Sequence, residues 1–289
     1  MRLEGQEEST NVEDRRGMGI KGGAALGGGG LLVVMLIAFL FNRDPGQIAS
    51  QIGVGGGGPQ GVQSGQVDPA EEQAAKFTKI ILGDTEKVWD EQFARLGRPY
   101  PKPTLVLFSG QVESACGSAD AQVGPFYCPG DQRVYIDLSF YKDMQKQLNA
   151  PGDFARAYVV AHEVGHHVQR ELGYSAKERA LVAAARGDKA AANRASVRLE
   201  LQADYLAGVW AHHAQKKFNF LEPGDLETAL NAANAIGDDR LQKQARGRVV
   251  PDSFTHGTSA QRVRWFRAGF DSGDVRGAAQ LFELPYDRL

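Results

Sequence analysis

The sequence has few cysteines and no excess of basic charge, and each shortage excludes a class of site. Only Cys116 and Cys128 occur among 289 residues, so a zinc site built mainly from thiolates is excluded. Lysine and arginine (33) are balanced by aspartate and glutamate (35), which leaves a formal net charge of −2. We therefore expect no nucleic-acid partner, because phosphate recognition needs a basic surface. Apolar residues, at 42%, are enough for a sizeable core.

Long apolar runs are also scarce, and the one candidate lies near the N-terminus. Residues 22–41 carry no charge and end in a wholly apolar half, which just reaches the length of about 20 residues that a transmembrane helix needs. Basic residues precede this segment, so it predicts a single-pass anchor in the inner (cytoplasmic) membrane, with residues 1–21 as a cytoplasmic tail. A cleaved secretory signal is the alternative, but no small-residue cleavage site follows Phe41.

The segment after the anchor separates it from a soluble domain. Residues 42–67 are rich in glycine, glutamine, proline and serine and cannot form a core, which is typical of a flexible linker. Asp68 followed by Pro69 is a typical helix start. We therefore expect one domain at 68–289, and the orientation of the anchor would place it in the periplasm or otherwise outside the cytoplasm.

The domain combines a few strands with many helices. Turn residues and alternating apolar residues predict a short strand and then a strand pair. Apolar periodicity predicts a nearly all-helical second half. The predicted strands are 104–108, 123–127 and 133–138, and the predicted helices are 154–172, 190–217, 225–244 and one after Ser259. This order indicates an α+β fold that is mostly helical with a small sheet or hairpin.

A histidine–glutamate motif on a predicted helix is the strongest functional signal. Residues 162–166 read His-Glu-Val-Gly-His. Histidines at i and i+4 share one helix face, so His162 and His166 can both reach one ion, and neutral imidazole is a preferred zinc ligand. Glu163 would lie beside the metal, where a general base can take a proton from a metal-activated water. The alternative, a helix with exposed polar residues, conflicts with the apolar flanks of the motif.

Two acidic residues on a later predicted helix are candidates for the missing ligand. A catalytic zinc has three protein ligands and leaves a fourth position for water. Glu200 and Asp204 share one face of the helix expected at 190–217, and apolar residues surround them. One carboxylate can bind the metal while the other accepts a hydrogen bond from a ligand imidazole. The alternative is a solvated, charged helix face.

These motifs resemble those of the gluzincin metallopeptidases, which carry His-Glu-x-x-His on one helix and Glu-x-x-x-Asp on a later one. The resemblance implies a zincin-like domain in which His162, His166 and Glu200 hold one Zn²⁺ per chain. It also implies that Asp204 supports His162 from behind. Over nearly its full length the chain resembles a narrower family, the bacterial putative neutral zinc metallopeptidases. That resemblance rests on Ser114-Ala-Cys-Gly117, Gly124-Pro-Phe-Tyr-Cys-Pro129, Val134-Tyr-Ile-Asp-Leu138, His162-Glu-Val-Gly-His-His-Val-Gln169, Glu200-Leu-Gln-Ala-Asp204 and His256-Gly-Thr-Ser-Ala-Gln-Arg262.

Other histidines and one arginine are weaker candidates. His256 lies in a predicted loop and can donate a hydrogen bond to the oxyanion of a tetrahedral intermediate, a position that related zincins fill with histidine, tyrosine or arginine. Alternatively, it closes a helix cap. Arg262 is a second candidate for that position, or only pairs with a carboxylate. His167 points away from the ligand face, and we expect it to be structural. His212 and His213 are expected to be satisfied surface or core residues.

The two cysteines form either a disulfide that closes a short loop or a pair of buried thiols. Outside the cytoplasm a disulfide between Cys116 and Cys128 is the natural product, and it would hold the loop 117–124 in place. In zincins an edge strand above the metal helix binds extended peptide through main-chain hydrogen bonds. The predicted hairpin 123–138 is our candidate for that strand.

The sequence therefore predicts a membrane-anchored, zinc-dependent endopeptidase with Glu163 as general base and a protein or peptide as substrate. Two alternatives stay open. One is a non-catalytic envelope protein with a structural zinc site, and the other is a zinc amidase that acts on a non-protein substrate.

Overall fold

The computed structural model describes residues 1–17, 68–120, 123–146 and 150–289. The anchor and the linker predicted at 22–67 lie outside these ranges. Within them, no helix is both long and apolar enough to cross a membrane. The expected α+β architecture, mostly helical with small sheets, is confirmed.

A four-stranded sheet lies on one side of the molecule, in the order β1-β2-β6-β5. Strands β1 (Val12–Asp14), β2 (Thr104–Phe108) and β6 (Arg133–Asp137) are parallel, and β5 (Phe126–Cys128) pairs antiparallel with β6 at the edge. The predicted hairpin is therefore confirmed, although its first strand begins three residues later than expected. Pro125, which has no N–H to donate to the ladder, immediately precedes it.

Two strand features were not predicted. Strand β1 comes from the segment that the sequence suggested to be a polar tail, and its three residues are too few to show alternation. A separate hairpin, β3 (Gln111–Ser114) with β4 (Gly117–Asp120), is short and mostly polar. Its turn carries Cys116, which is joined to Cys128 at the end of β5. The predicted disulfide is thus present, and it ties the small hairpin to the edge of the main sheet.

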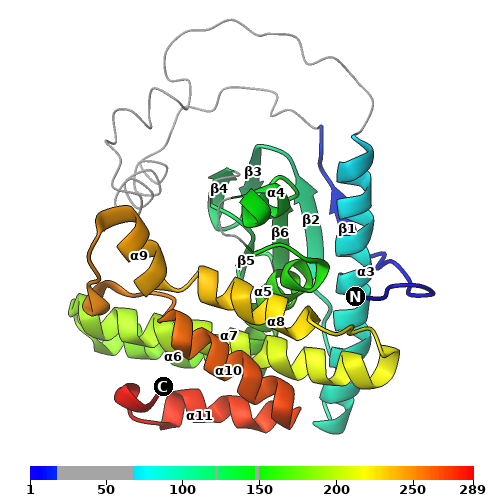
Figure 1. Cartoon of the computed structure of the whole chain (residues 1–289). Helices are drawn as coiled ribbons and strands as arrows, with labels where there is room; N and C mark the ends of the chain where they lie inside the picture. The colour runs from blue at the N-terminus through cyan, green and yellow to red at the C-terminus, as the bar shows by residue number, and fades with distance from the viewer. Residues whose placement is uncertain (18–67, 121–122, 147–149) are drawn as a thin grey trace, which may run out of the picture.

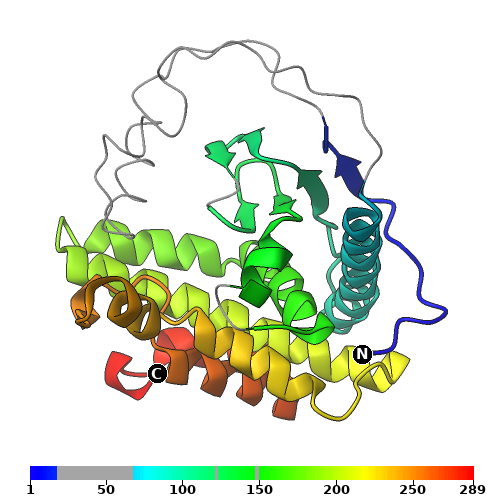
Figure 2. The same ribbon diagram turned by 45° about the horizontal axis from the view of Figure 1, so that its top comes forward.

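The helices form a layer beneath the sheet and a support beside it. The long helices α7 and α10 and the shorter α8 cross below the strands, while α3 runs alongside β1 and β2 (Figures 1 and 2). The α-helices are α3 (Pro69–Arg95), α4 (Phe140–Lys146), α5 (Asp153–Leu172), α6 (Tyr174–Ala184), α7 (Lys189–Phe218), α8 (Asp225–Ala235), α9 (Asp238–Arg246), α10 (Ser259–Ser272) and α11 (Gln280–Glu283).

One helix prediction was wrong. The segment 225–244 was expected to form a single helix, but it breaks after Ala235 into α8 and α9. The break is made by tertiary hydrogen bonds: the backbone N–H of Asp238 donates to the carbonyl of Gly257, and its carboxylate accepts from the backbone of the following loop. Helical periodicity carries no information on such distant partners.

Helix α5 is the element that positions the site. It is buried along most of its length, between the sheet and α7. Gly165 allows the close approach of the two helices, because a Cβ on it would lie 3.0 Å from the carbonyl oxygen of Ala203 on α7. A larger residue would push α7 away and separate the side chains that the two helices bring together.

Candidate metal centre

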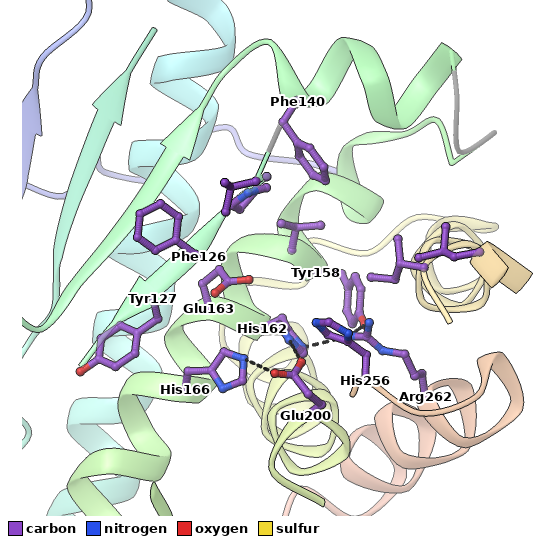
Figure 3. Close-up of a pocket in the computed structure, with 16 residues that line it drawn as sticks. Phe126, Tyr127, Phe140, Tyr158, His162, Glu163, His166, Glu200, His256 and Arg262 are labelled. Atoms are coloured by element: carbon purple, nitrogen blue, oxygen red, sulfur yellow. Dashed lines mark hydrogen bonds and ion pairs between the residues drawn. The ribbon is translucent and has the colours of Figure 1, made fainter. Parts of the chain in front are cut away.

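Three candidate metal ligands converge from α5 and α7 (Figure 3). The Nε2 atom of His162 lies 3.2 Å from Glu200 Oε2, and the Nε2 atom of His166 lies 3.5 Å from Glu200 Oε1. One ligand atom from each of the three residues lies within 4.8 Å of the others, so this group can hold a metal ion. Two imidazoles and a carboxylate form a donor set that zinc accepts in catalytic sites. The residues therefore fit the metal that the sequence suggested.

Each ligand histidine is oriented through its other ring nitrogen. His162 Nδ1 lies 2.9 Å from Asp204 Oδ1, and His166 Nδ1 lies 2.9 Å from the amide oxygen of Gln169. Gln169 is held in turn by donating to the carbonyl of Leu199 on α7. Since both Nδ1 atoms face acceptors, we assign the protons to Nδ1, which leaves the Nε2 lone pairs of both rings for a metal.

Asp204 is the centre of a buried ionic network behind His162. Its side chain is fully buried. Besides the His162 imidazole, it accepts a hydrogen bond of 2.5 Å from the Tyr158 hydroxyl and two from the Arg262 guanidinium, at 2.8 and 3.0 Å. Burial raises the pKa of Asp204, but Arg262 and His162 outweigh it and hold the pKa below its usual value. The structure thus gives Arg262 the carboxylate-pairing role.

Glu163 lies on the pocket side of the ligand group, with its carboxyl group pointing toward β5 (Figure 3). Its side chain is buried, and burial raises its pKa to about 7 against the opposing effects of His162 and the backbone N–H of Tyr127. No ion pair holds this carboxylate among the described residues. Glu163 is therefore a base close to neutral pH that lines the pocket and is not neutralised by an ion pair with any described residue.

His256 lies across the ligand group from Glu163 (Figure 3). Its side chain is 48% exposed, and its Nδ1 lies 3.5 Å from Asp238 Oδ1. Partial burial lowers the pKa of His256, but the negative charges of Glu200 and Asp238 together raise it by more. The net shift of its pKa is therefore upward. The alternative role as a helix cap is wrong, because Thr258 caps α10 in a capping box with Gln261.

Asp238 fixes the loop that carries His256. Its Oδ2 accepts three consecutive backbone N–H groups, from Thr255, His256 and Gly257, at 2.6 to 3.1 Å. A carboxylate saturated in this way defines the backbone of the loop. The same residue thus sets both the place of the His256 ring and the charge next to it.

A pocket of about 420 Å³ opens over these groups. One wall is β5 with the residues that precede it, and the others come from α4, α5 and the α8–α9 corner. The apolar lining residues are Val123, Pro125, Phe126, Phe140, Val159, Ile236 and Leu241. The predicted hairpin therefore borders the candidate metal centre, with β5 as the edge strand of its sheet.

The remaining histidines lie away from the pocket. His167 is fully buried, its Nε2 donates to the Pro101 carbonyl, and its Nδ1 lies 3.0 Å from the Tyr127 hydroxyl. His212 and His213 hydrogen-bond backbone carbonyls at the end of α10. These contacts match the structural roles that we expected.

Sequence reasoning missed three supporting residues: Tyr158, Gln169 and Asp238. Tyr158 precedes His162 by one helical turn, and Gln169 follows His166 by three residues, so the i,i+4 and i,i+3 spacings could have found both. Asp238 had no such signal, because its partners lie in a distant loop.

The chain is similar to a known protein family and to several bacterial proteins. The model of a family described as "Putative neutral zinc metallopeptidase" matches residues 1–280. The "Uncharacterized protein YpfJ" of Escherichia coli (strain K12) is 52% identical over 290 residues, which cover 95% of this chain and 96% of that protein. The "Uncharacterized protein Rv2575" of Mycobacterium tuberculosis (strain ATCC 25618 / H37Rv) is 43% identical over 211 residues, 70% of each chain. No solved structure matches. On these grounds the chain belongs to the Putative neutral zinc metallopeptidase family.

Proposed function

We propose that the protein is a zinc-dependent endopeptidase. The observation that carries the proposal is the placement of Glu163: a buried carboxylate without an ion-pair partner among the described residues, beside the converging Nε2 atoms of His162 and His166 and facing a pocket. A structural metal site would need the ligands but would have no use for this carboxylate. A hydrolase needs it as a base.

The chemistry divides among three groups. Bound zinc would supply Lewis acidity toward water and the scissile carbonyl, held by His162, His166 and Glu200. Glu163 takes the proton of the attacking water and passes it to the leaving amine. His256, whose raised pKa favours the protonated ring, donates a hydrogen bond to the oxygen that becomes negatively charged.

The pocket supports an extended peptide as the substrate. Strand β5 is an edge strand and lines the pocket, so a peptide that binds beside it can form main-chain hydrogen bonds. Among the described lining residues, the one guanidinium is that of Arg262, and it is engaged by Asp204 and Tyr158. A terminal carboxylate would find no free arginine or lysine there, which favours cleavage within a chain over removal of C-terminal residues.

The periplasmic or otherwise extracytoplasmic location of the domain is part of the same proposal. It is supported by the disulfide between Cys116 and Cys128, since disulfides form and persist outside the reducing cytoplasm. The membrane contributes as an attachment surface through the apolar segment 22–41.

The test is a cleavage assay on a mixed-sequence peptide library, with metal content measured on the same preparation. We expect about one zinc per chain and internal cleavage that a chelator abolishes and added zinc restores. The matched control is Glu200→Gln, which keeps the size of the side chain and removes the charged ligand. It should lose both metal and activity.

Other outcomes separate the alternatives. Zinc retained without cleavage of any peptide would support the non-catalytic envelope protein. Chelator-sensitive hydrolysis of a non-peptide amide, with peptides left intact, would support the amidase. Cleavage that survives complete metal removal would exclude the zinc mechanism.

A further inference from the structure

The first sixteen residues are folded onto the domain. The backbone of Arg2 donates to the carbonyl of Phe220 beyond α7, at 2.8 Å, and that of Ser9 donates to the carbonyl of Lys79 on α3, at 3.0 Å. Met1, Leu3 and Val12 pack against the main hydrophobic core. This segment therefore contacts elements from both halves of the domain, and it runs beside α3 before it enters the sheet as β1 (Figure 1).

A buried polar contact holds the middle of the segment. The Ser9 hydroxyl donates to Glu86 Oε1 at 2.8 Å, and the side-chain amide of Asn11 donates to the same oxygen at 2.8 Å. Both Ser9 and Glu86 are less than 9% exposed. Without the segment, the carboxylate of Glu86 would lose both of these donors.

The surface of α3 is shaped to receive the segment. A Cβ on Gly83 would lie 2.8 Å from the carbonyl oxygen of Glu7, so this position must lack a side chain for the segment to lie where it does. On the sheet, Val12, Glu13 and Asp14 pair in register with Leu105 to Leu107. Hydrogen bonds from Leu105 to the Asn11 carbonyl and from Arg15 to the Leu107 carbonyl extend the pairing.

The end of the N-terminal segment lies beside the start of α3. Arg16, at the end of the segment, pairs with Glu72 at 2.7 Å and with Glu71 at 3.7 Å, both in the first turn of α3. Arg16 and the first turn of α3 therefore lie side by side, and the segment between them in the sequence contains residues 18–67. If that segment crossed a membrane once, residues 1–16 would be on the opposite side from the domain, and none of these contacts could form.

We infer that residues 1–16 are a structural part of the catalytic domain and lie on the same side of the membrane as residues 68–289. This replaces the single-pass arrangement expected from the sequence, in which residues 1–21 form a cytoplasmic tail. The inference does not depend on the proposed activity.

The side of each part can be measured on the full-length protein in vesicles of the expressing bacterium. Glu4→Cys and Lys189→Cys, at two exposed positions, are labelled in separate variants with a membrane-impermeant maleimide, in right-side-out and in inverted vesicles. We expect both positions to react in the same type of vesicle. Labelling of Glu4→Cys in one type and of Lys189→Cys in the other would overturn the inference. Full labelling of both after detergent treatment is the control for reactivity.

Docking is measured separately, by the unfolding temperature of the full-length protein. Ser9→Ala removes a buried hydrogen bond and should lower Tm by about 2–4 °C. Thr10→Ala is the matched control, because the adjacent Thr10 side chain is exposed and its loss should leave Tm unchanged. Equal Tm values for Ser9→Ala and the parent protein would show that the segment is not docked, and would overturn the inference independently of the labelling.

Discussion

Glu163 and Asp204 are buried carboxylates on opposite sides of the same ligand group, and their surroundings differ completely. Asp204, behind His162, accepts hydrogen bonds from an imidazole, a phenol and a guanidinium, and its pKa is lowered. Glu163, in front, faces the pocket, and burial raises its pKa to about 7. The first carboxylate is a fixed charge that orients a ligand, and the second can exchange a proton near neutral pH.

Burial alone therefore does not assign a role to an acidic residue. Hydrogen-bond donors around a buried carboxylate stabilise its charged form. A pocket beside the carboxylate gives water and substrate access, so that a proton can be exchanged. Both carboxylates border the candidate metal ligands, yet only Glu163 faces the pocket in which we propose that the substrate binds.

The largest expected effect is on catalysis. Glu163→Gln removes the base without changing the size of the side chain, and should reduce kcat by roughly 10⁴-fold while zinc is retained. The measurement is peptide turnover together with metal content. Should the variant cleave as fast as the parent protein with its zinc in place, Glu163 would not be the base.

Arg262→Met tests the opposite side of the comparison. It removes the guanidinium that neutralises Asp204 and leaves a buried charge, which should lower the free energy of unfolding by about 3–5 kcal/mol. Denaturant titration measures this. Arg267→Met, on the exposed face of the same helix, is the control and should change stability by less than about 0.5 kcal/mol. Similar stabilities for the two variants would refute the role of the network.

Asp84 on α3 extends the comparison to a buried carboxylate with neither network nor pocket. Its oxygens have no hydrogen-bond partner among the described residues, and burial raises its pKa to about 7 despite the nearby Lys87. Because the folded pKa exceeds the unfolded one, the stabilising effect of the protonated group is complete below about pH 4 and is lost as the pH rises through 7.

Asp84→Asn should therefore remove this dependence. Between pH 4 and pH 8, the free energy of unfolding of the variant should rise by on the order of 4 kcal/mol relative to that of the parent protein. This corresponds to the difference of about three units between the folded and the unfolded pKa of Asp84. The measurement is denaturant unfolding across this pH range, on protein from which a chelator has removed any metal. Asp90→Asn, at an exposed position on the same helix, should show no such gain. If the difference in the free energy of unfolding between Asp84→Asn and the parent protein did not change with pH, burial would not oppose ionisation of the Asp84 carboxyl group.

The smallest expected effect concerns His256, which lines the pocket. His256→Ala should reduce kcat by about 10²–10³-fold with little change in KM, as expected for a donor that acts mainly in the transition state. Asp238→Asn, which keeps an oxygen for the loop but removes the charge beside His256, should cause a smaller loss. An effect of His256→Ala on KM alone would assign the residue to substrate binding instead.

Local spacing explains what the sequence could predict. The i,i+4 pairs on α5 and α7 placed His162 with His166 and Glu200 with Asp204 on common faces, because helix geometry is independent of the rest of the fold. The separation into ligand and support came only from a resemblance, and the structure distinguishes them by distance: Asp204 reaches Nδ1 of His162, and Glu200 reaches Nε2.

Long-range contacts explain what the sequence could not predict. Strand β1 is recognisable only through its pairing with β2, since three residues carry too little pattern. The break before Asp238 depends on backbone donors in the loop 255–257. The sequence could not decide whether Arg262 stabilises an oxyanion or pairs with a carboxylate. Its partner Asp204 lies on another helix, and local spacing does not predict such contacts.

The pairing of β1 with β2 also has a consequence for the order in which the protein folds. Val12 must wait for Leu105, and Arg2 must wait for Phe220, so the partners of the N-terminal segment are made one after another, and the partner of Arg2 comes much later than that of Val12. Contacts between such remote positions close large loops and form late. We expect the pairing of β1 with β2 to cover the edge of β2 early, and the contact of Arg2 with Phe220 to be the later step.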